Sequence, residues 1–395
     1  MTVIQIDESD RALIEQLRSQ ISEELKLLPE YDDDVNLLRW LVGWDRKINV
    51  IVPKIKKSLK TVVALGLEKV DLSSIEKITE YCDSVSKSLK YLPGSLLGFD
   101  NEGNLISITM IGHIDIHGLL SSTKNSDLYV MKIAESFGAL RLIKSQEKLL
   151  GRQVGSAIIM DLEGLTSDML WMPAVKTISN LLTELQELFP DVVRRLFFIN
   201  VPSFIQMVWT LFSPCLAKQT QQKVRFLGDD WKDELKKCID PNVLYEHWGG
   251  CRKASTPYGH LKSGGKVPSE LRYDPANDLP DSKLERISIS ARSMKCIPIN
   301  IIVNGGEPKI LKWWWRIESG DIDFSVCFSK DNDKTDSISE SDILLRPKFR
   351  LQTEFVPENG EVLCSTSGTY KLVFDNTYGK LWSKNIRVFY EISGQ

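Results

Sequence analysis

The chain has 395 residues, of which 42% are hydrophobic and 26% charged, and this composition is typical of a folded protein with two or three domains. The formal net charge of -3 excludes a strong overall attraction to nucleic acid, so any basic surface has to be local. Residues 1–10 are acidic and contain no apolar segment of a secretory signal, and no apolar run is long enough to predict a membrane-spanning helix. We therefore expect a cytoplasmic protein.

The cysteines support this expectation. Their number is odd, their spacing is wide and no Cys-x-x-Cys pair occurs, which argues against a disulfide scaffold and against a zinc site. Reduced thiols in a reducing compartment are therefore expected at Cys82, Cys215, Cys238, Cys251, Cys296, Cys327 and Cys364.

Residues 1–90 are predicted to form an N-terminal helical region. Apolar residues recur at helical spacing at Leu13, Leu17, Ile21 and Leu25. A polar group that favours the start of a later helix comes at Asp71, Ser73 and Ser74. Four lysines cluster between these two segments, at Lys54, Lys56, Lys57 and Lys60. We interpret this cluster as a solvated helix face, with attraction to anionic lipid headgroups as the alternative.

Residues 91–251 alternate between predicted strands and helices. Short apolar runs predict strands at 105–111, 156–160, 196–201 and 224–227. Helices are expected at 127–150, 177–189, 202–216 and 230–238. Strands that alternate with helical crossovers predict an α/β domain with a largely parallel sheet.

The C-terminal part of the chain has a different pattern. Residues 252–283 are rich in Gly, Pro, Ser and Lys and are predicted to be a linker. Residues 284–395 contain short alternating segments that predict a β-sandwich of roughly eight strands. Trp313, Trp314 and Trp315 are consecutive in one of these strands, so the first and third should point to one face and the second to the other.

The sequence contains no motif that indicates an enzyme. Neither a glycine-rich phosphate loop nor a Gly-x-Ser-x-Gly elbow is present, so a lipid-modifying α/β enzyme is the least favoured function. His113 and His117 are interpreted as ordinary polar histidines rather than metal ligands. Asp161 and Glu163 could form an acid pair, but a polar turn is expected there anyway, directly after a strand. We predict no catalytic residue, no metal and no cofactor.

The segment 202–216 has an unusual composition. On a helix, one narrow stripe would hold its polar side chains, which are Ser203, Gln206, Thr210 and Ser213. The remaining surface is apolar and includes Phe204, Met207, Val208, Trp209, Leu211 and Phe212. Two interpretations are open: a fully buried core helix, or a helix that packs on the sheet and also faces a lipid. Pro214 near its end could act as a hinge.

The middle of the chain resembles the CRAL-TRIO lipid-binding domain. The resemblance rests on an ordered series of motifs at 158–164, 188–191, 198–202, 209–216, 220–231 and 246–250, and the run 37–41 is similar to the family's N-terminal helices. The sequence departs from the family at 42–44, where a basic stretch is usual, and at Tyr245, where proline is frequent. The resemblance implies a lipid pocket between the sheet and a mobile gate, and residues 202–222 fall on the gate.

The C-terminal part resembles a GOLD domain. The matching residues are found at 311–313, 321–324, 368–372 and 374–378. A CRAL-TRIO domain followed by GOLD is the layout of the supernatant protein factor and tocopherol-associated protein group. This layout implies a protein that transfers or presents a hydrophobic lipid between membranes or to partners. The alternative is a lipid-sensing adaptor in membrane trafficking that recruits proteins through GOLD.

The resemblance also implies which residues contact the ligand. Relatives that bind phosphatidylinositol use an acid and a lysine that correspond here to Asp191 and Lys223, although glutamate is usual at the first position. Relatives that bind phosphatidylcholine use two hydroxyl residues, of which Ser156 retains one and Ile158 replaces the other. The predicted lipid-binding residues are Ser156, Ile158, Met160, Asp191, Phe198, Phe204, Met207, Val208, Phe212 and Lys223.

The expected partners follow from the same resemblance. They are a hydrophobic ligand (phospholipid, phosphoinositide, tocopherol or isoprenoid), a membrane contacted transiently, and a protein bound through GOLD. Nucleic acid is not expected as a partner.

Overall fold

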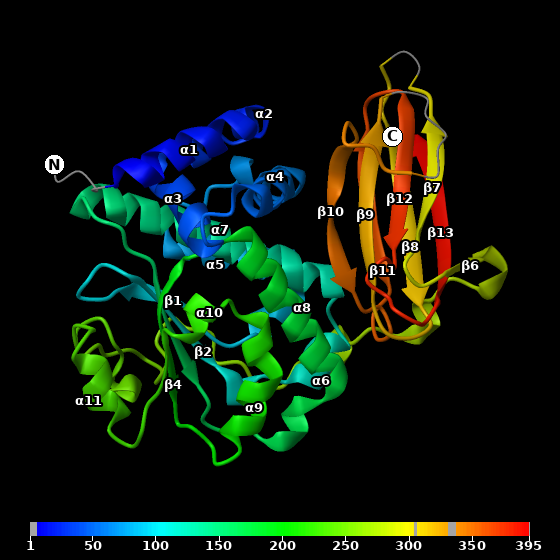
Figure 1. The fold of residues 1–395 in the computed structure, drawn as a ribbon. Coiled ribbons are helices and arrows are strands. Elements are labelled where there is room, and N and C mark those ends of the chain that lie inside the picture. The colour runs from blue at the N-terminus through cyan, green and yellow to red at the C-terminus, as the bar shows by residue number, and fades with distance from the viewer. Residues whose placement is uncertain (1–5, 304–305, 331–336, 395) are drawn as a thin grey trace. The chain divides into compact units, whose positions relative to one another are not determined.

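The computed structural model describes residues 6–303, 306–330 and 337–394, and it divides into two compact units (Figure 1). Unit 1 consists of Met1–Val63, Leu67–Leu119 and Val130–Ser269, and unit 2 of Ala64–Gly66, Leu120–Tyr129 and Glu270–Gln395. The boundary after Ser269 divides the predicted linker, residues 252–283. Leu261 and Val267 are buried in unit 1, so the first part of this segment packs against the domain that precedes it.

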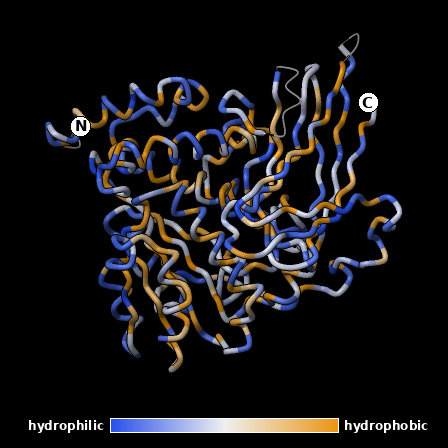
Figure 2. Tube along the Cα trace, turned by 45° about the vertical axis from the view of Figure 1, so that its right-hand side comes forward, coloured by the Kyte–Doolittle hydropathy of each residue, from blue (hydrophilic) through white to orange (hydrophobic). Residues whose placement is uncertain are grey.

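The N-terminal part of unit 1 is helical, as predicted. Its helices are α1 (Glu8–Gln20), α2 (Ser22–Leu27), α3 (Asp34–Gly43), α4 (Ile48–Ala64) and α5 (Ile75–Val85). Figure 2 shows hydrophilic and hydrophobic residues alternating in the helical turns next to the N-terminus, as in amphipathic helices. The predicted helix start near Ser74 is a true N-cap, because the side chain of Ser74 accepts a hydrogen bond from the backbone N–H of Lys77.

Three of the four lysines in the α4 cluster form ion pairs with acids on other helices. Lys54 lies 2.7 Å from Glu187, and Lys57 lies 2.7 Å from Glu184. Lys56 pairs with Glu24 at 3.1 Å. The interpretation of this cluster as a solvated face is therefore corrected, and its lysines are poorly placed to attract lipid headgroups. Local sequence gave no sign of these pairs because the acids come from α2 and α8.

Within the described residues, unit 1 contains one five-stranded sheet with the order β1-β2-β3-β4-β5. The strands are β1 (Ser95–Phe99), β2 (Leu105–Met110), β3 (Ser156–Asp161), β4 (Val193–Ile199) and β5 (Val224–Phe226). β2, β3, β4 and β5 pair in parallel, which confirms the largely parallel sheet. The sequence analysis missed β1, which is antiparallel to β2 and has a bulge between Leu96 and Gly98.

Four of the six later helices of the α/β part lie close to their predicted positions, and the two shortest were not predicted. They are α6 (Ile116–Leu120), α7 (Asn125–Leu150), α8 (Met172–Leu188), α9 (Ile205–Phe212), α10 (Lys218–Gln221) and α11 (Trp231–Lys236). None of the helices in the part of the chain that is described has the length and hydrophobicity needed to cross a membrane.

One face of the sheet carries the hydrophobic core of this domain. Ala157 and Ile159 of β3 and Ile199 of β4 are completely buried on it. Trp231 and Leu235 of α11 belong to the same core cluster, so α11 covers this face. We call it the core face.

In unit 2, the described strands form two antiparallel four-stranded sheets, with the orders β10-β9-β12-β7 and β11-β8-β13-β6. The strands are β6 (Glu285–Ile289), β7 (Met294–Ile301), β8 (Lys309–Ile317), β9 (Ile322–Ser329), β10 (Ile343–Leu351), β11 (Glu358–Cys364), β12 (Gly368–Asp375) and β13 (Lys384–Gly394). This arrangement confirms the predicted β-rich C-terminal region.

The tryptophan run of β8 is divided between the two faces of its sheet, as predicted. Trp313 and Trp315 are buried, whereas Trp314 is half-buried. The ring of Trp315 lies 5.2 Å from Phe324 of β9 and 5.3 Å from Phe374 of β12. These aromatic contacts join the two sheets into a sandwich.

Glu358 of β11 provides a test of the packing in unit 2. This side chain is 6% exposed, and burial raises the pKa of its carboxyl from 4.5 to about 7. The folded protein therefore holds this proton more tightly than the unfolded chain, so stability should fall as pH rises from about 4.5 to about 7. The side chain introduced by Glu358→Gln cannot ionise, so this decline in stability should be absent from the variant.

The measurement is the free energy of unfolding of both proteins between about pH 5 and pH 8. We expect the variant to gain stability relative to wild type as the pH rises. An identical pH dependence of the two proteins would contradict the assigned burial of an ionisable Glu358.

Candidate functional site

The second face of the sheet in unit 1 is apolar but only half-buried. Along β3, burial alternates strictly: Ala157, Ile159 and Asp161 are buried, whereas Ser156, Ile158 and Met160 are half-buried. Because neighbouring side chains of a strand point to opposite faces, the second group lies on the face opposite the core face. We call this surface the half-buried face.

The neighbouring strands extend the half-buried face through the register of the sheet. Met160 pairs with Phe198 of β4, which in turn pairs with Phe226 of β5. On the other side, Ser107 of β2 pairs with Ile158. Phe198 and Ser107 are half-buried, and Phe226 is 40% exposed. The same strands thus have one sealed face and one face whose apolar side chains are incompletely covered.

The helix α9 lies over the half-buried face. The ring of Trp209 is 6.4 Å from Phe198 and 5.6 Å from Phe226, and these two phenylalanines stack at 5.0 Å. Figure 1 accordingly shows α8 and α9 on the side of the sheet opposite α11. The predicted helix 202–216 is shorter than expected, because α9 ends at Phe212 and a 3-10 turn, Ser213–Cys215, follows.

No residue of α9 is buried, so the interpretation as a fully buried core helix is wrong. Its predicted lipid-contacting residues differ in exposure: Met207 is 50% exposed, whereas Val208, Phe212 and the preceding Phe204 are half-buried. A strongly apolar helix that packs on the sheet only through part of its surface agrees with the second interpretation, in which one side contacts protein and another is available to a ligand.

The helix α8 adds an apolar stripe that the sequence analysis did not identify. Four of its side chains recur at helical spacing and are half-buried rather than buried: Ile178, Leu181, Leu182 and Leu185. One turn after Leu182, the side chain of Gln186 accepts hydrogen bonds from the backbone of Ala217 and from Thr220. This stripe is therefore directed towards the segment that contains α9 and α10. The spacing of its side chains, i, i+3, i+4 and i+7, is the sequence pattern from which this stripe could have been predicted.

The α9–α10 segment, residues 203–222, is held to the domain mainly near its two ends. Before it, Asn200 has a positive φ of 52°, and its side-chain amide donates to Asp161 at 2.8 Å. At the far end, Gln219 donates to the backbone carbonyl of Val42 at 2.9 Å. Between these attachments, the described packing is largely apolar. Such an arrangement lets the middle of a segment move without breaking its anchoring hydrogen bonds.

Asp161 is the buried anchor at the start of this segment. Trp248 donates to its carboxylate at 3.0 Å, and the backbone N–H of Glu163 donates at 3.1 Å. Burial opposes ionisation of Asp161, but the interactions with His247, Asn200, Glu163 and Trp248 together outweigh it and lower the pKa. Asp161 therefore stays ionised and joins the end of β3 to both the α9–α10 segment and the C-terminal turn of the domain.

Asp161, Glu163 and His247 also lie close enough to offer one ligand atom each to a metal ion. His247 Nε2 is 3.8 Å from both carboxylates. Both oxygens of Asp161 already accept hydrogen bonds that hold the fold together. We assign this group a structural role, as the sequence analysis did for Asp161 and Glu163.

The two residues predicted to contact a headgroup, Asp191 and Lys223, are brought together. Lys223 Nζ lies 3.0 Å from the carboxylate of Asp191 and donates to the carbonyl of Val193 at 2.7 Å. The Asp191 side chain is 7% exposed and also pairs with Arg194 at 3.1 Å. This ion pair lies at the start of β4 and immediately after the α9–α10 segment, apart from Phe198 and Met160 at the other end of the strands.

A second buried ion pair lies beside it. Arg39 and Glu147 are in contact, with side chains 2% and 6% exposed. Arg39 also donates to the backbone carbonyls of Val154 and Asp191, at 2.6 and 3.1 Å. Burial lowers the pKa of Arg39 and raises the pKa of Glu147. The pair links α3 and α7 to the strand ends that carry Asp191.

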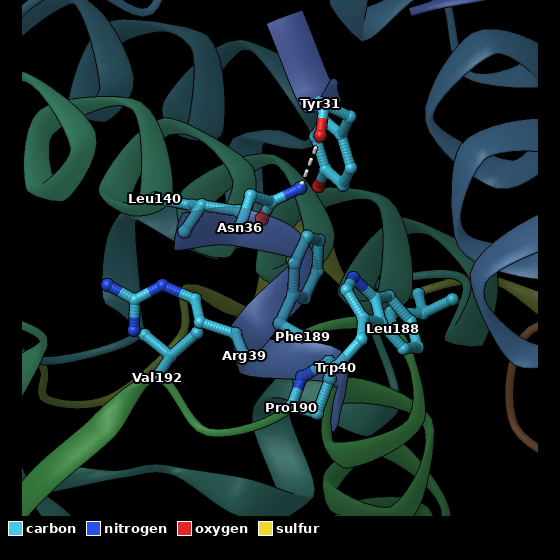
Figure 3. Close-up of a pocket in the computed structure, with 9 residues that line it drawn as sticks. All are labelled: Tyr31, Asn36, Arg39, Trp40, Leu140, Leu188, Phe189, Pro190 and Val192. Carbon is cyan, nitrogen blue, oxygen red and sulfur yellow. Dashed lines mark hydrogen bonds between the residues drawn. The ribbon is translucent and has the colours of Figure 1, made fainter. Parts of the chain in front are cut away.

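Figure 3 shows a cavity next to Arg39, in which Tyr31 and Asn36 are joined by a hydrogen bond and Trp40 and Phe189 form a wall. Its volume is about 10 Å³, which is near the minimum that one water molecule requires. This cavity is therefore too small for a lipid, and its position away from the half-buried face separates it from the candidate site.

Comparisons with known proteins agree with this geometry. Residues 89–250 match the family model of the CRAL/TRIO domain, which confirms the predicted CRAL-TRIO domain. The chain is similar to a CRAL-TRIO domain-containing protein of Caenorhabditis elegans, with 26% identity over 351 residues that cover 87% of this chain and 81% of that protein. Protein ctg-1 of the same organism is 24% identical over 394 residues, covering 97% of this chain and 98% of its own.

Two further similarities are more distant. Protein real-time of Drosophila melanogaster is 22% identical over 348 residues, which cover 77% of this chain and 51% of that protein. The crystal structure of Sfh5 aligns with a TM-score of 0.44 and 14% identity, covering 69% of this chain and 93% of its own.

The Arg39–Glu147 pair can be tested by removing one partner and then both. Arg39→Met leaves Glu147 buried without its cation, so we expect a loss of about 3–5 kcal/mol in unfolding free energy. The double variant Arg39→Met/Glu147→Leu should be more stable than the single variant, because no charge is left unpaired. Denaturant unfolding of wild type, Arg39→Met, Glu147→Leu and the double variant measures both effects. A double variant that loses as much stability as the two single variants combined would contradict a paired interaction.

Proposed function

We propose that the chain binds a lipophilic ligand between the half-buried face and helices α8 and α9, and that it transfers or presents this ligand between membranes or to partners. Proteins of the CRAL-TRIO family bind and transfer lipophilic ligands. The observation that supports the proposal most directly is the contrast within β3, where Ile159 is completely buried and Ile158 and Met160 are not. A folded domain normally buries such side chains on both faces when helices cover the sheet.

The physical argument concerns the cost of exposing a lipid chain to water. Each methylene group costs about 0.8 kcal/mol to transfer to water, so a tail of sixteen carbons resists leaving a membrane by roughly 12 kcal/mol. The half-buried face and the stripe on α8 offer an apolar surface that shields such a tail. The ligand would in turn cover Ile158, Met160 and Phe198, which are otherwise incompletely packed.

The α9–α10 segment is proposed to be the gate. Its attachments through Asn200 and Gln219 lie outside the apolar middle, so movement of that middle exposes the ligand without breaking them. Met207, which is 50% exposed, together with Val208 and Phe212, would rest in the membrane when the gate opens. This proposal includes the transient membrane contact and the cytoplasmic location expected from the sequence.

Transfer between vesicles tests the gate. Val208→Asp/Phe212→Asp places charges on the apolar side of α9 and should reduce the rate of lipid transfer by about tenfold or more, because a charged side chain is costly to bury in a membrane. Thr210→Asp is the matched control: it adds a charge to the same helix at an exposed polar position. We expect the control to transfer lipid nearly as fast as wild type.

Two results would contradict this role of α9. One is undiminished transfer by the folded Val208→Asp/Phe212→Asp protein, and the other is an equal loss in the Thr210→Asp control. Native mass spectrometry of each purified protein, followed by lipid extraction, shows whether the ligand is retained and identifies its class.

For the ligand class, we propose a phosphoinositide or another phospholipid, with tocopherol and isoprenoids as alternatives. The ion pair of Lys223 with Asp191 supports a phosphorylated headgroup, because a lysine that directly follows the gate in the chain can exchange its carboxylate partner for a phosphate. The hydroxyl groups of Ser156 and Ser107 on the half-buried face are further polar contacts within the site.

Lys223→Ala tests the headgroup contact. If Lys223 binds a phosphate, the variant should lose affinity for phosphatidylinositol by about tenfold while it keeps affinity for a neutral isoprenoid. Lys218→Ala, an exposed lysine on α10, serves as the control and should bind both ligands normally. Unchanged phosphatidylinositol binding by Lys223→Ala would remove this lysine from the site.

We also propose that unit 2 is a GOLD domain and that it binds a protein partner. The residues that carry the resemblance, including Trp313, Phe324 and Phe374, belong to the aromatic packing that joins the two sheets. Because these residues pack inside the sandwich, a protein partner has to bind to other residues on its surface.

A further inference from the structure

The loop between β12 and β13 presents two large apolar side chains to solvent. Leu381 is 81% exposed and Trp382 is 77% exposed. They are adjacent in the chain, so the loop tip carries two neighbouring exposed apolar side chains. Met294, at the start of β7, is 40% exposed and pairs with Asp375 at the end of β12. Large apolar side chains that are exposed together often mark a site that contacts a protein or a membrane.

The base of the loop is held in place by hydrogen bonds. Asn376 is completely buried, and its side-chain amide donates to the carbonyls of Ile289, Ser290 and Trp382, at 3.2, 3.1 and 3.1 Å. The backbone N–H of Arg292 donates to the carbonyls of Asn376 and Gly379. These bonds fasten the β12–β13 loop to the β6–β7 loop. Leu381 and Trp382 therefore project from a rigid base, which limits the entropy lost when they bind.

The two joined loops and the first residues of β7 and β13, residues 290–295 and 376–384, contain basic but no acidic residues. Their charged residues are Arg292, Lys295, Lys380 and Lys384. Three of them, Arg292, Lys295 and Lys380, are exposed to solvent. We call this surface the basic loop edge. The acids next to it are engaged: Asp375 pairs with Lys348 at 3.2 Å, and Asp321 accepts a hydrogen bond from Tyr378 at 2.6 Å.

We propose that the basic loop edge docks on an anionic membrane surface, with Leu381 and Trp382 inserted at the level of the headgroups. Tryptophan favours this interfacial region because one part of its ring system is apolar and its N–H is polar. The surrounding cations would attract anionic lipids, each by about fivefold in affinity. Positive charge around a projecting apolar tip suits a membrane, whereas an acidic protein would need a pocket matched to the tip.

This inference goes beyond the proposed lipid site, because it assigns a separate membrane contact to unit 2. The half-buried face and the gate belong to unit 1, and neither contributes a residue to the basic loop edge. A protein with a defective gate should still dock, and a protein with a defective loop should still hold its ligand. The two proposals can therefore fail independently.

Vesicle sedimentation with the full chain tests the docking. Wild type should bind vesicles of phosphatidylcholine with about a quarter phosphatidylserine much more tightly than vesicles of phosphatidylcholine alone. Leu381→Ser/Trp382→Ser should bind the anionic vesicles at least about tenfold more weakly, because two large apolar side chains no longer leave water. Lys380→Glu/Lys384→Glu should also weaken binding and should reduce its sensitivity to salt.

Leu363→Ser is the matched control, since Leu363 lies in the same unit, on β11, and is 54% exposed. It should bind like wild type. Trp382→Phe supplies a second readout: the blue shift in tryptophan fluorescence that vesicles cause in wild type should be largely lost. Thermal unfolding and the amount of copurified ligand should be unchanged in every loop variant.

The docking proposal is overturned by any of three outcomes. Wild type could fail to bind anionic vesicles, the Leu381→Ser/Trp382→Ser protein could bind them as tightly as wild type, or Leu363→Ser could weaken binding to the same extent. Binding that does not depend on phosphatidylserine would overturn the role assigned to the four cations.

Discussion

The contrast between the two faces of the central sheet is the constraint on which the rest of unit 1 depends. On the core face, Ile159 and Ile199 pack into a sealed cluster with Trp231 of α11, and this packing fixes the position of β3 and β4. The same strands carry Ile158 and Phe198 on their other side, so these side chains are held rigidly whether or not they are covered. A stable domain with an incompletely covered apolar surface is therefore possible, because one face supplies the stability that the other does not.

Buried charges lie at both ends of the segment that we propose as the gate. Asp161 anchors the chain before α9, and the pair of Asp191 with Lys223 anchors it after α10. The Arg39–Glu147 pair fixes the N-terminal helices to the same region. Since an unpaired charge in such a position is costly, these contacts resist opening. The apolar contacts of Trp209 are less directional than hydrogen bonds and ion pairs. In the proposed gate, contacts with a lipid or a membrane can replace them.

Unit 2 uses aromatic residues in two different ways. Trp315 lies between the sheets, 0% exposed, and Trp382 lies on a loop, 77% exposed. The first type of position serves the fold, because its ring contacts Phe324 and Phe374. The second has no comparable packing and is surrounded by positive charge. We therefore propose that unit 1 encloses a hydrophobic molecule and that unit 2 inserts into a hydrophobic layer.

Much of the fold followed from sequence alone, because strands, helices and caps depend on neighbouring residues. The alternation of strands and helices, the N-cap at Ser74 and the division of the three tryptophans were all predictable from local patterns. The motifs also located β3, β4 and α9, which carry most of the candidate site. The short strand β1 was missed because Gly98 and a bulge interrupt its pattern.

Only the tertiary structure decided how these elements are used. The partners of Lys54 and Lys57 lie on α8, and the partner of Lys223 is Asp191, so neither set of pairs is visible in the local sequence. The composition of α9 left burial and exposure equally open, because an apolar helix has the same sequence in both cases. The exposure of a side chain depends on what packs against it, and this packing depends on contacts between segments that lie far apart in the sequence.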